Sequence, residues 1–416
     1  MRDQNAVHDA QQILTHYHAK SPAFDGIRVI ELGQVYNGPY CGLLLSLHGA
    51  EVIKIEPPGG ELLRFRSVEA VETHEFVMLN SNKRSVVIDF KQVEGRTFFE
   101  RLIKTADVLI ENYSPGVMAR LGLDPERLMQ ENPRLIYATG KGYGLAGPYA
   151  HMAAMDLTVQ AMSGTISSTG FPDQDPVKTG PAFIDFMSGV HLFAGVATAL
   201  FQRERTGLGQ LVEVSMHDTV YPTLASSLGG LYNNPGKEVP ERTGNRHTGL
   251  AVSPYNVYQA RDGHLAIISA SERHFSALVD VIGRSELADD ERFKNPLARV
   301  ANSESLDAEI NAWTRSRDRW ECVELLSRTG VPSAPVLTVR EVADDHHLKE
   351  RGMIREIEHP RRGRVNIPAS PIRLSESPVG EIRVAPTLGE STDAVLADLG
   401  YLPDAIEVLR QGGAVQ

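Results

Sequence analysis

Apolar positions in the first part of the chain alternate between short β-type runs and longer stretches with helical spacing. The first clear unit covers 26–56, where IRVIEL is followed by the helical stretch NGPYCGLLLSLHGA and then by EVIKIE. A strand, a helix and a strand joined by short connections are typical of a βαβ unit. The chain therefore predicts a parallel sheet from its beginning.

The same alternation continues as far as about residue 140. SVVIDF at 85–90 is apolar and β-rich, 92–106 has helical spacing, and DVLIEN at 107–112 is a further strand. A short helix in PGVMARLG precedes the strand RLIYATG. This order favours an α/β fold with helices on both faces of the sheet.

The texture changes after residue 156. A segment rich in Gly, Ser and Thr precedes a long apolar helix at roughly 187–205, which Gly207 and Gly209 are suited to end, and LVEVSM then predicts one more strand. The stretch 233–249 is rich in Pro, Gly, Asn and charged residues. Such a composition is typical of a long loop or a domain linker.

A second, smaller domain of α+β type is expected beyond this linker. Two strands are predicted around the turn at Asp262 and Gly263, with helical segments at 271–283 and 305–329 and further β-rich segments after them. Two domains are expected because a chain of 416 residues exceeds one compact core. The helical tail is expected to pack back on the first domain, which makes that domain discontinuous in sequence. The expected limits are 1–225 for the first part of the large domain, 226–335 for the small domain with its linkers, and 336–416 for the returning segment.

Composition and charge narrow the classes of function. The net charge of −11 argues against nucleic acid as a partner, whereas an anionic small ligand needs only a local group of basic side chains and backbone N–H groups. The two cysteines, Cys41 and Cys322, are far apart and form no metal-ligand pattern with histidines, so we expect free thiols, no metal site and a reducing compartment. The first residues resemble neither a signal peptide nor a membrane span, and the cytoplasm is the expected location.

Several familiar catalytic and nucleotide-binding motifs are missing. The first βα turn reads GQVYNGPY and lacks the G-x-G-x-x-G spacing that dinucleotide binding requires. The chain also has no G-x-S-x-G elbow, no Walker loop and no H-E-x-x-H motif. Catalysis is therefore expected to use carboxylates, histidines or backbone donors.

Asp185 is the strongest catalytic candidate from the residues alone. It lies between apolar neighbours in GPAFIDFMSGVH, at the start of the long apolar helix. A carboxylate there would be partly desolvated and stabilised by helical N–H groups. The alternative is that Asp185 is only a helix N-cap, a position that Asp favours.

Six blocks of sequence resemble the class III CoA-transferases, the family of formyl-CoA and carnitine CoA-transferases and of alpha-methylacyl-CoA racemase. They run in order from Gly26 toward the C-terminal tail: GIRVIELGQVYNGPYCGLLLSLHGAEVIKIEPPGGELLR, LNSNKRSVVIDFK, ADVLIENYSPGVMARLGL, NPRLIYATGKGYGLAGPY, RTGLGQLVEVSMHD and RTGNRHTGLAVSPYNVYQARDGH. The resemblance implies an interlocked homodimer whose Rossmann-like large domain is built from both chain ends. It also implies that Asp185, in the block PAFIDFMSG, is the nucleophile.

The same resemblance implies a set of residues that bind coenzyme A. Val35, Tyr36 and Asn37 would line the CoA site, and Asn112 and Arg120 would reach its nucleotide end. For each of them a role in the core, a turn or the solvated surface is an equal alternative. Lys83 and Arg84 are additional phosphate partners, although a solvated loop before a strand explains them as well.

The block 242–249 corresponds to a loop that in relatives covers the reacting anhydride and excludes water. Asn245 and His247 are therefore candidates for contact with substrate. The loop is less rich in glycine than the oxalate-type version, which argues against formyl-CoA and oxalate as substrates.

Two alternatives remain beside the transferase. The racemase pattern has a His before an Asp, but here Met155 precedes Asp156, and inversion with only one base is inefficient. Asp156 is then either a substrate-side acid or a helix-capping residue. A catalytically silent CoA-binding protein is the second alternative, and the presence of Asp185 argues against it.

The predicted function is reversible transfer of CoA from an acyl-CoA donor, such as succinyl-CoA, to a carboxylic acid. It proceeds through a mixed anhydride and an aspartyl-CoA thioester on Asp185. Coenzyme A and its thioesters are substrates in this chemistry, and no permanently bound cofactor is expected.

Overall fold

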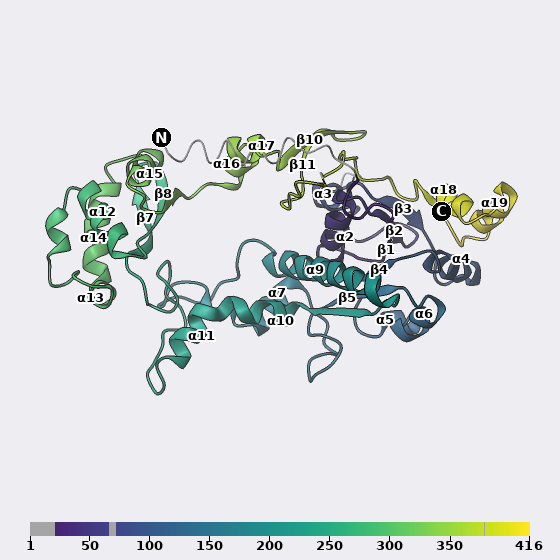
Figure 1. Ribbon diagram of the computed structural model, residues 1–416, viewed down its shortest axis with the longest axis horizontal. Helices are drawn as coiled ribbons and strands as arrows, with labels where there is room; N and C mark the ends of the chain where they lie inside the picture. Colours follow the sequence, from purple (N-terminus) through teal and green to yellow (C-terminus); the bar gives the residue numbers. More distant parts are fainter. Residues whose placement is uncertain (1–20, 66–71, 378) are drawn as a thin grey trace. The chain divides into compact units, whose positions relative to one another are not determined.

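The computed structural model describes residues 21–65, 72–377 and 379–416 (Figure 1). The chain forms two compact units. We call them the large unit, made of 1–159, 182–219 and 346–416, and the small unit, made of 160–181 and 220–345. Each is described by itself.

A six-stranded parallel sheet forms the centre of the large unit, in the order β3-β2-β1-β4-β5-β6. Its strands are β1 (Arg28–Glu31), β2 (Glu51–Glu56), β3 (Arg84–Val87), β4 (Val108–Glu111), β5 (Ile136–Lys141) and β6 (Leu211–Ser215). The order reverses between β1 and β4, which makes this pair a topological switch point. The expected α/β fold is confirmed.

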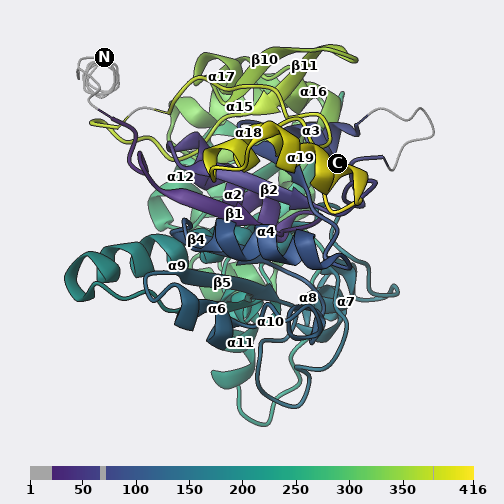
Figure 2. The ribbon, with the colours of Figure 1, turned by 90° about the vertical axis from the view of Figure 1, so that its right-hand side faces the viewer.

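Helices cover both faces of this sheet (Figure 2). Within the described residues, the helices of the large unit are α2 (Asn37–Leu47), α3 (His74–Asn80), α4 (Val93–Ile103), α5 (Val117–Arg120), α6 (Pro125–Glu131), α9 (Phe183–Thr206), α17 (His346–Glu350), α18 (Thr392–Asp398) and α19 (Pro403–Gln411). Two short helices, α7 (Asp156–Met162) and α10 (Met216–Val220), include the boundaries between the units. Successive residues of a strand point to opposite faces, so Val29 packs with α2 and α9 while Ile30 packs with α4. Both faces are apolar, which explains the continuous β-type runs of the sequence.

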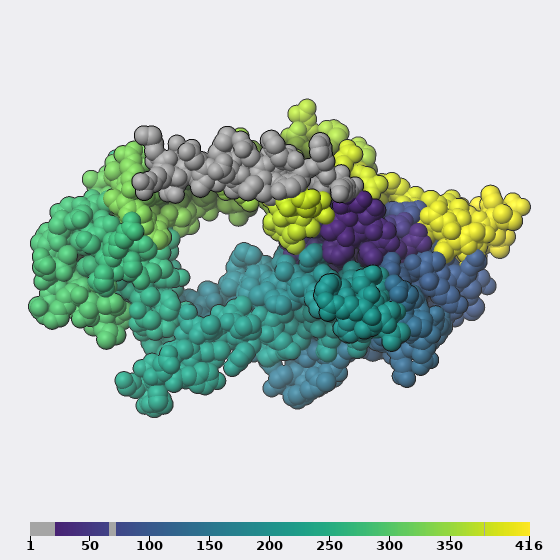
Figure 3. Space-filling model, viewed as in Figure 1, coloured from purple at the N-terminus to yellow at the C-terminus, as the bar shows by residue number. Residues whose placement is uncertain are grey.

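The C-terminal segment belongs to the large unit. A hairpin of β10 (Ile354–His359) and β11 (Gly363–Pro368) precedes α18 and α19, which bury Leu396 and Ile406 in the same core as α4. A β-bridge joins Ile88 to Val415. In the space-filling view the yellow C-terminal residues lie against the blue residues of the large unit (Figure 3). These contacts join the C-terminal segment to the core of the large unit.

The small unit has its own core and an antiparallel sheet in the order β7-β8-β9. The strands are β7 (Tyr255–Ala260), β8 (Gly263–Ile268) and β9 (Ser333–Pro335), and the first two flank the turn predicted at Asp262. Its helical elements are α8 (Thr165–Ser168), η1 (Tyr221–Leu224), α11 (Ala225–Tyr232), α12 (Glu272–Val281), η2 (Ser285–Ala288), α13 (Pro296–Ala301), α14 (Ser303–Thr314), α15 (Arg319–Arg328) and α16 (Val339–Ala343). The helical segment predicted at 305–329 forms two helices, because the helical conformation is interrupted between Thr314 and Arg319.

The 24-residue helix α9 is the one described helix long and apolar enough to cross a membrane, judged by length and composition alone. Its residues Leu192, Val196 and Ala199 pack on the sheet among the strand residues Val108 and Ile136. Packing against a central sheet explains the apolar character of this helix.

Candidate active site

A cavity of about 220 Å³ lies in the large unit where β1, β4 and β5 end. The turn after β1 contributes Val35 and Asn37, the turn after β4 contributes Asn112, and the end of β5 contributes Gly140. Asp185 also lines this cavity. Ligands of open parallel sheets bind at such a crevice beside the switch point, so this cavity is the candidate active site.

Asp185 lies in the first turn of α9, two residues after the helix begins at Phe183. The N-cap residue is Ala182, whose side chain makes no capping bond, so the reading of Asp185 as an N-cap is wrong. Asp156 performs that role from α7, because its Oδ2 accepts the N–H groups of Ile184 at 3.0 Å and of Asp185 at 3.2 Å. Of the two roles expected for Asp156, helix capping is therefore seen in the structure.

The Asp185 carboxylate has little to stabilise a negative charge. Asp185 is 9% exposed, and its carboxylate accepts no hydrogen bond from the residues that the structure describes. Burial, together with the nearby charge of Asp156, raises the pKa of Asp185 to about 7. The expected stabilisation by helical N–H groups is thus wrong, because the carboxylate of Asp156 already takes two of them.

A short chain of hydrogen bonds supports the backbone of Asp185. The Asn37 amide donates to the Ser188 hydroxyl, and that hydroxyl donates to the Asp185 carbonyl at 3.0 Å. Asn37 is almost fully buried, and its side chain fills the space beside Gly140, where an added Cβ would lie 2.3 Å from its Oδ1. The absence of a side chain at Gly140 is therefore required for the position of Asn37.

The turn after β1 is held to the end of β4 by Asn112. Its Oδ1 accepts the N–H of Gln34 at 2.8 Å, and its Nδ2 donates to the carbonyl of the same residue at 2.9 Å. This reciprocal pair fixes part of the wall of the cavity that Asp185 also lines. Val35, next along the turn, lies on that wall.

A family model described as CoA-transferase family III matches residues 24–392. The chain belongs to this family. The resemblance read from the sequence is therefore confirmed, and with it the class of enzyme, a class III CoA-transferase.

Curated relatives match nearly the whole length of the chain. A formyl-CoA:oxalate CoA-transferase of Streptomyces coelicolor is 35% identical over 94% of this chain and 99% of its own length. An acetyl-CoA:oxalate CoA-transferase of Acetobacter aceti is 40% identical over 85% of this chain and 89% of its own.

Solved structures agree with the fold. A CaiB/BaiF family protein from Brucella suis has a TM-score of 0.80 at 36% identity and covers 91% of this chain and 100% of its own. A hypothetical protein from Mycobacterium tuberculosis has the same TM-score at 30% identity, with the same coverage of both chains. These likenesses extend the match of the CoA-transferase family III from sequence to structure.

The structure does not bring every candidate of this CoA-transferase to the cavity. Tyr36 lies beside it, where its ring stacks on Phe186 with centroids 5.6 Å apart. Arg120 is exposed at the end of α5 and does not line the cavity. Arg84 pairs with Glu51 and, at 3.2 Å, with Asp398.

Lys83 points into the protein. Its Nζ donates to Glu31 at 2.9 Å, to the Pro39 carbonyl at 2.9 Å and to Asn80 at 3.0 Å, and the residue is 5% exposed. These bonds use its three donors, so the structure does not present Lys83 to a phosphate. Burial lowers the pKa of Lys83 to about 8, although the Glu31 carboxylate opposes the change.

Asn245 and His247 lie in the small unit. Asn245 is exposed, whereas the Nδ1 of His247 accepts the N–H of Gly249 at 3.1 Å and its ring packs edge-on against Tyr255. The loop is tied down further by Arg246, whose guanidinium lies 3.2 Å from the Asp307 carboxylate. His247 is therefore held by its own loop.

Sequence reasoning missed Ser188 and Gly140 as parts of the site. Ser188 follows Asp185 by one helical turn, and this spacing was the available signal. The described residues hold no group of three or more His, Cys, Asp or Glu side chains that could bind a metal ion.

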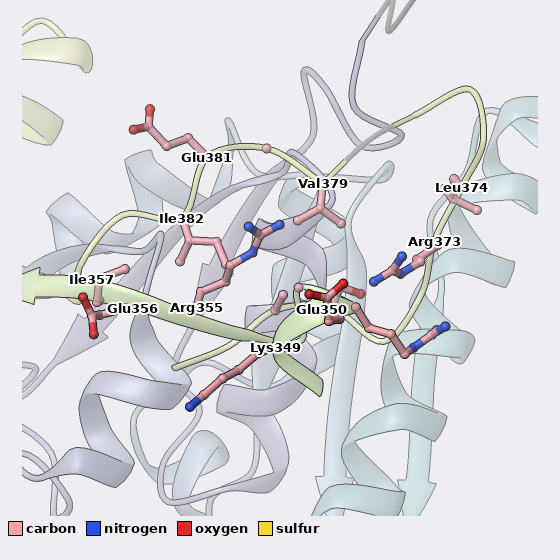
Figure 4. Close-up of a pocket in the computed structure, with 15 residues that line it drawn as sticks. Lys349, Glu350, Arg355, Glu356, Ile357, Arg373, Leu374, Val379, Glu381 and Ile382 are labelled. Carbon is pink, nitrogen blue, oxygen red and sulfur yellow. The ribbon is translucent and has the colours of Figure 1, made fainter. Parts of the chain in front are cut away.

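A larger cavity of the large unit, about 770 Å³, lies elsewhere. Charged side chains of both signs line it, among them Arg355, Arg373, Glu350 and Glu381 (Figure 4). None of the candidate catalytic or CoA-binding residues lines it. Size alone therefore does not identify the active site of this CoA-transferase.

Proposed function

We propose that this protein transfers CoA reversibly from an acyl-CoA to a carboxylic acid, with Asp185 as the nucleophile. One observation about Asp185 carries the proposal. The Asp185 carboxylate is buried, without a hydrogen-bond partner among the described residues, and lines a cavity at the switch point of the sheet. A desolvated carboxylate of this kind is a reactive nucleophile.

The reaction has two halves that mirror each other. An Asp185 oxygen attacks the thioester carbonyl carbon, the C–S bond breaks, and CoA leaves as a thiolate beside a mixed anhydride. The thiolate then attacks the side-chain carbonyl carbon of Asp185, which releases the first acid and leaves an aspartyl-CoA thioester. The acceptor carboxylate attacks that thioester to form a second anhydride, and the thiolate attacks the acceptor's carbonyl carbon to release product and free Asp185.

Val35 and Asn37 are proposed to line the CoA site, because they line the same cavity as Asp185, and Tyr36 lies between them in the chain. Asn112 and Arg120 are proposed to reach the nucleotide end of CoA. Asn245 and His247 are proposed to cover the reacting anhydride and to keep water from it. The family resemblance also implies an interlocked homodimer, which we propose for this protein. We propose the cytoplasm as its location.

The acids exchanged are proposed to be small, because relatives are named for formyl-CoA, acetyl-CoA and oxalate. Succinyl-CoA is the first donor to test, and formyl-CoA and acetyl-CoA follow because relatives carry those names.

Chemical trapping tests the nucleophile. The protein is incubated with each acyl-CoA and treated with hydroxylamine or borohydride, and the modified peptide is identified by mass spectrometry. We expect modification at Asp185 and loss of CoA transfer in Asp185→Ala. Unchanged transfer in Asp185→Ala, or labelling of another peptide, contradicts the proposal.

A further inference from the structure

The turn between β1 and α2 holds a β-branched residue in the left-handed region of backbone conformation. Val35 has a φ of 63°. A side chain branched at Cβ crowds the backbone there, so such a residue persists only where its surroundings impose the conformation. Val35 lines the cavity that contains Asp185. The strain is thus located on the wall of the candidate active site.

Polar side chains from other elements fix this turn. The Asn112 amide holds the residue before Val35 by the two hydrogen bonds described above. The Lys54 ammonium donates to the carbonyl of Gly33 at 2.8 Å. The N–H of Val35 itself donates to Oε2 of Glu61 at 3.3 Å. Glu61 therefore holds the strained residue directly.

Glu61 occupies an unfavourable place for a carboxylate. It is 4% exposed, its Oε2 lies 3.6 Å from the Lys54 ammonium, and its Oε1 is buried without a hydrogen-bond partner among the described residues. Burial raises the pKa of Glu61, the charge of Lys54 opposes that rise, and the carboxylates of Glu56 and Glu31 add to it. A buried carboxylate with an unpaired oxygen carries a cost in free energy. Its bond to the strained N–H gives a reason for its presence.

We infer that Glu61 is a positioning residue for CoA transfer, which acts by holding Val35 and the turn after β1 in the shape that faces Asp185. This inference rests on the proposed function of the cavity. The turn leads directly into Asn37, whose amide bonds to Ser188 beneath the Asp185 backbone. A shift of the turn therefore moves both the wall of the cavity and the support of the nucleophile.

Removal of the acceptor tests the inference. We expect Glu61→Ala to lower kcat by about 10- to 100-fold, because a displacement of about 1 Å between reacting groups has an effect of this size, while KM for the acyl-CoA changes less than about threefold. Glu61→Gln keeps an oxygen that accepts the Val35 N–H, so it should retain far more of the wild-type kcat than Glu61→Ala. The split between kcat and KM separates positioning from general loss of structure.

The effect of Glu61→Ala on kcat is also measured in a protein that carries Val35→Gly, and this comparison decides the inference. Glycine adopts a positive φ without crowding, so the turn no longer depends on Glu61 to hold it. The loss caused by Glu61→Ala should therefore fall to about threefold or less when it is measured against Val35→Gly. An equal loss in both backgrounds overturns the inference, and so does Glu61→Ala with wild-type kcat.

A variant away from the cavity shows whether lost stability alone lowers kcat. Asp107 pairs with the buried Arg203 at 2.9 Å, at the amino end of β4 and away from the cavity. Asp107→Ala removes a partly buried ion pair and should lower the thermal midpoint while leaving kcat unchanged. If Glu61→Ala does not fold, Glu61→Asp replaces it in both Val35 backgrounds, because its carboxylate is one methylene short of the Val35 N–H, and the same two outcomes decide.

The outcome is separable from that of the proposed function. The coupling between Glu61 and Val35 is read from the rate of transfer, whichever residue is the nucleophile. Trapping at a residue other than Asp185 would refute the proposed nucleophile, and the presence or absence of the coupling would still be measured.

Discussion

The carboxylate of Asp156 accepts the backbone N–H groups of Ile184 and Asp185 and so completes the first turn of the helix that carries Asp185. The same bonds take up N–H groups that would otherwise favour a charge on Asp185. One carboxylate thus orders the helix end and, by its charge, helps burial to raise the pKa of the other. The predictions below follow from this relationship and from the packing around it.

Transfer should depend on pH through Asp185. Because the pKa of Asp185 is raised to about 7 and the nucleophile must be ionised, kcat/KM should rise with pH and level off above neutrality. The measurement is a profile of kcat/KM between pH 5 and 9, in roughly half-unit steps. A rate independent of pH between 5 and 8 would contradict an assignment of this group as the nucleophile.

Two substitutions of Asp156 should separate its two effects. Asp156→Asn keeps an oxygen that can accept the same N–H groups but removes the charge, so the pH profile should move to lower pH with little loss of stability. Asp156→Ala removes the cap as well and should lower the free energy of unfolding by about 1 kcal/mol. The checks are pH profiles and urea unfolding of both variants, and identical behaviour of the two would contradict the capping role.

Asp185→Asn should abolish transfer and stabilise the protein at neutral pH. The pKa of Asp185 is higher in the folded state than its usual 3.8, so the folded state binds more protons and loses stability as pH rises from about 4 to about 7. The variant lacks this loss, and its advantage over wild type should be near zero below pH 4 and reach roughly 4 kcal/mol at most above pH 7. Unfolding by urea at several pH values measures the difference. An advantage that is greatest at low pH would contradict the sign.

Gly189→Ala should destabilise the protein although alanine favours helices. Gly189 faces α2, and an added Cβ would lie 2.8 Å from the Asn37 carbonyl, a backbone atom that cannot move away freely. We expect a loss of about 1–3 kcal/mol and reduced transfer. The control is Gly229→Ala in α11, where only the Asn233 side chain lies within 4 Å, and a gain of about 0.5–1 kcal/mol is expected. Equal effects of the two substitutions on unfolding would show that close packing at Gly189 does not matter.

The protein should not invert the α-carbon of an acyl-CoA. Met155 lines the cavity where the racemase pattern has a His, and the thioether cannot carry a proton to or from carbon. We expect no deuterium at the α-carbon of a 2-methylacyl-CoA in D2O under conditions where CoA transfer proceeds. Uptake of deuterium at the rate of transfer would favour the racemase.

The local sequence pattern was sufficient to predict the strands of the large unit and the place of Asp185 at the start of a helix. Neighbouring strand residues such as Val29 and Ile30 pack on opposite faces of the sheet and are both apolar, and Asp185 interrupts an apolar run. The pattern could not predict that Asp156, 29 positions away, would cap α9 in place of Ala182. That bond depends on how α7 is placed beside α9 in the fold.

The basic residues show the same limit. Lys83 and Arg84 are adjacent in a segment that looks like a solvated loop. In the fold, Lys83 meets Glu31, 52 positions earlier, whereas Arg84 meets Asp398, 314 positions later. Whether such a side chain serves a ligand or the interior depends on partners that local sequence does not reveal. The domain limits and the CoA-binding residues stay predictions for this reason.

The late position of Val415 has a consequence for how the protein is made. Ile88 cannot meet its bridge partner, and α4 cannot meet the apolar side chains of α18 and α19, until the chain has been synthesised past Val415. The hydrophobic surface left open on the growing chain is a target for chaperones.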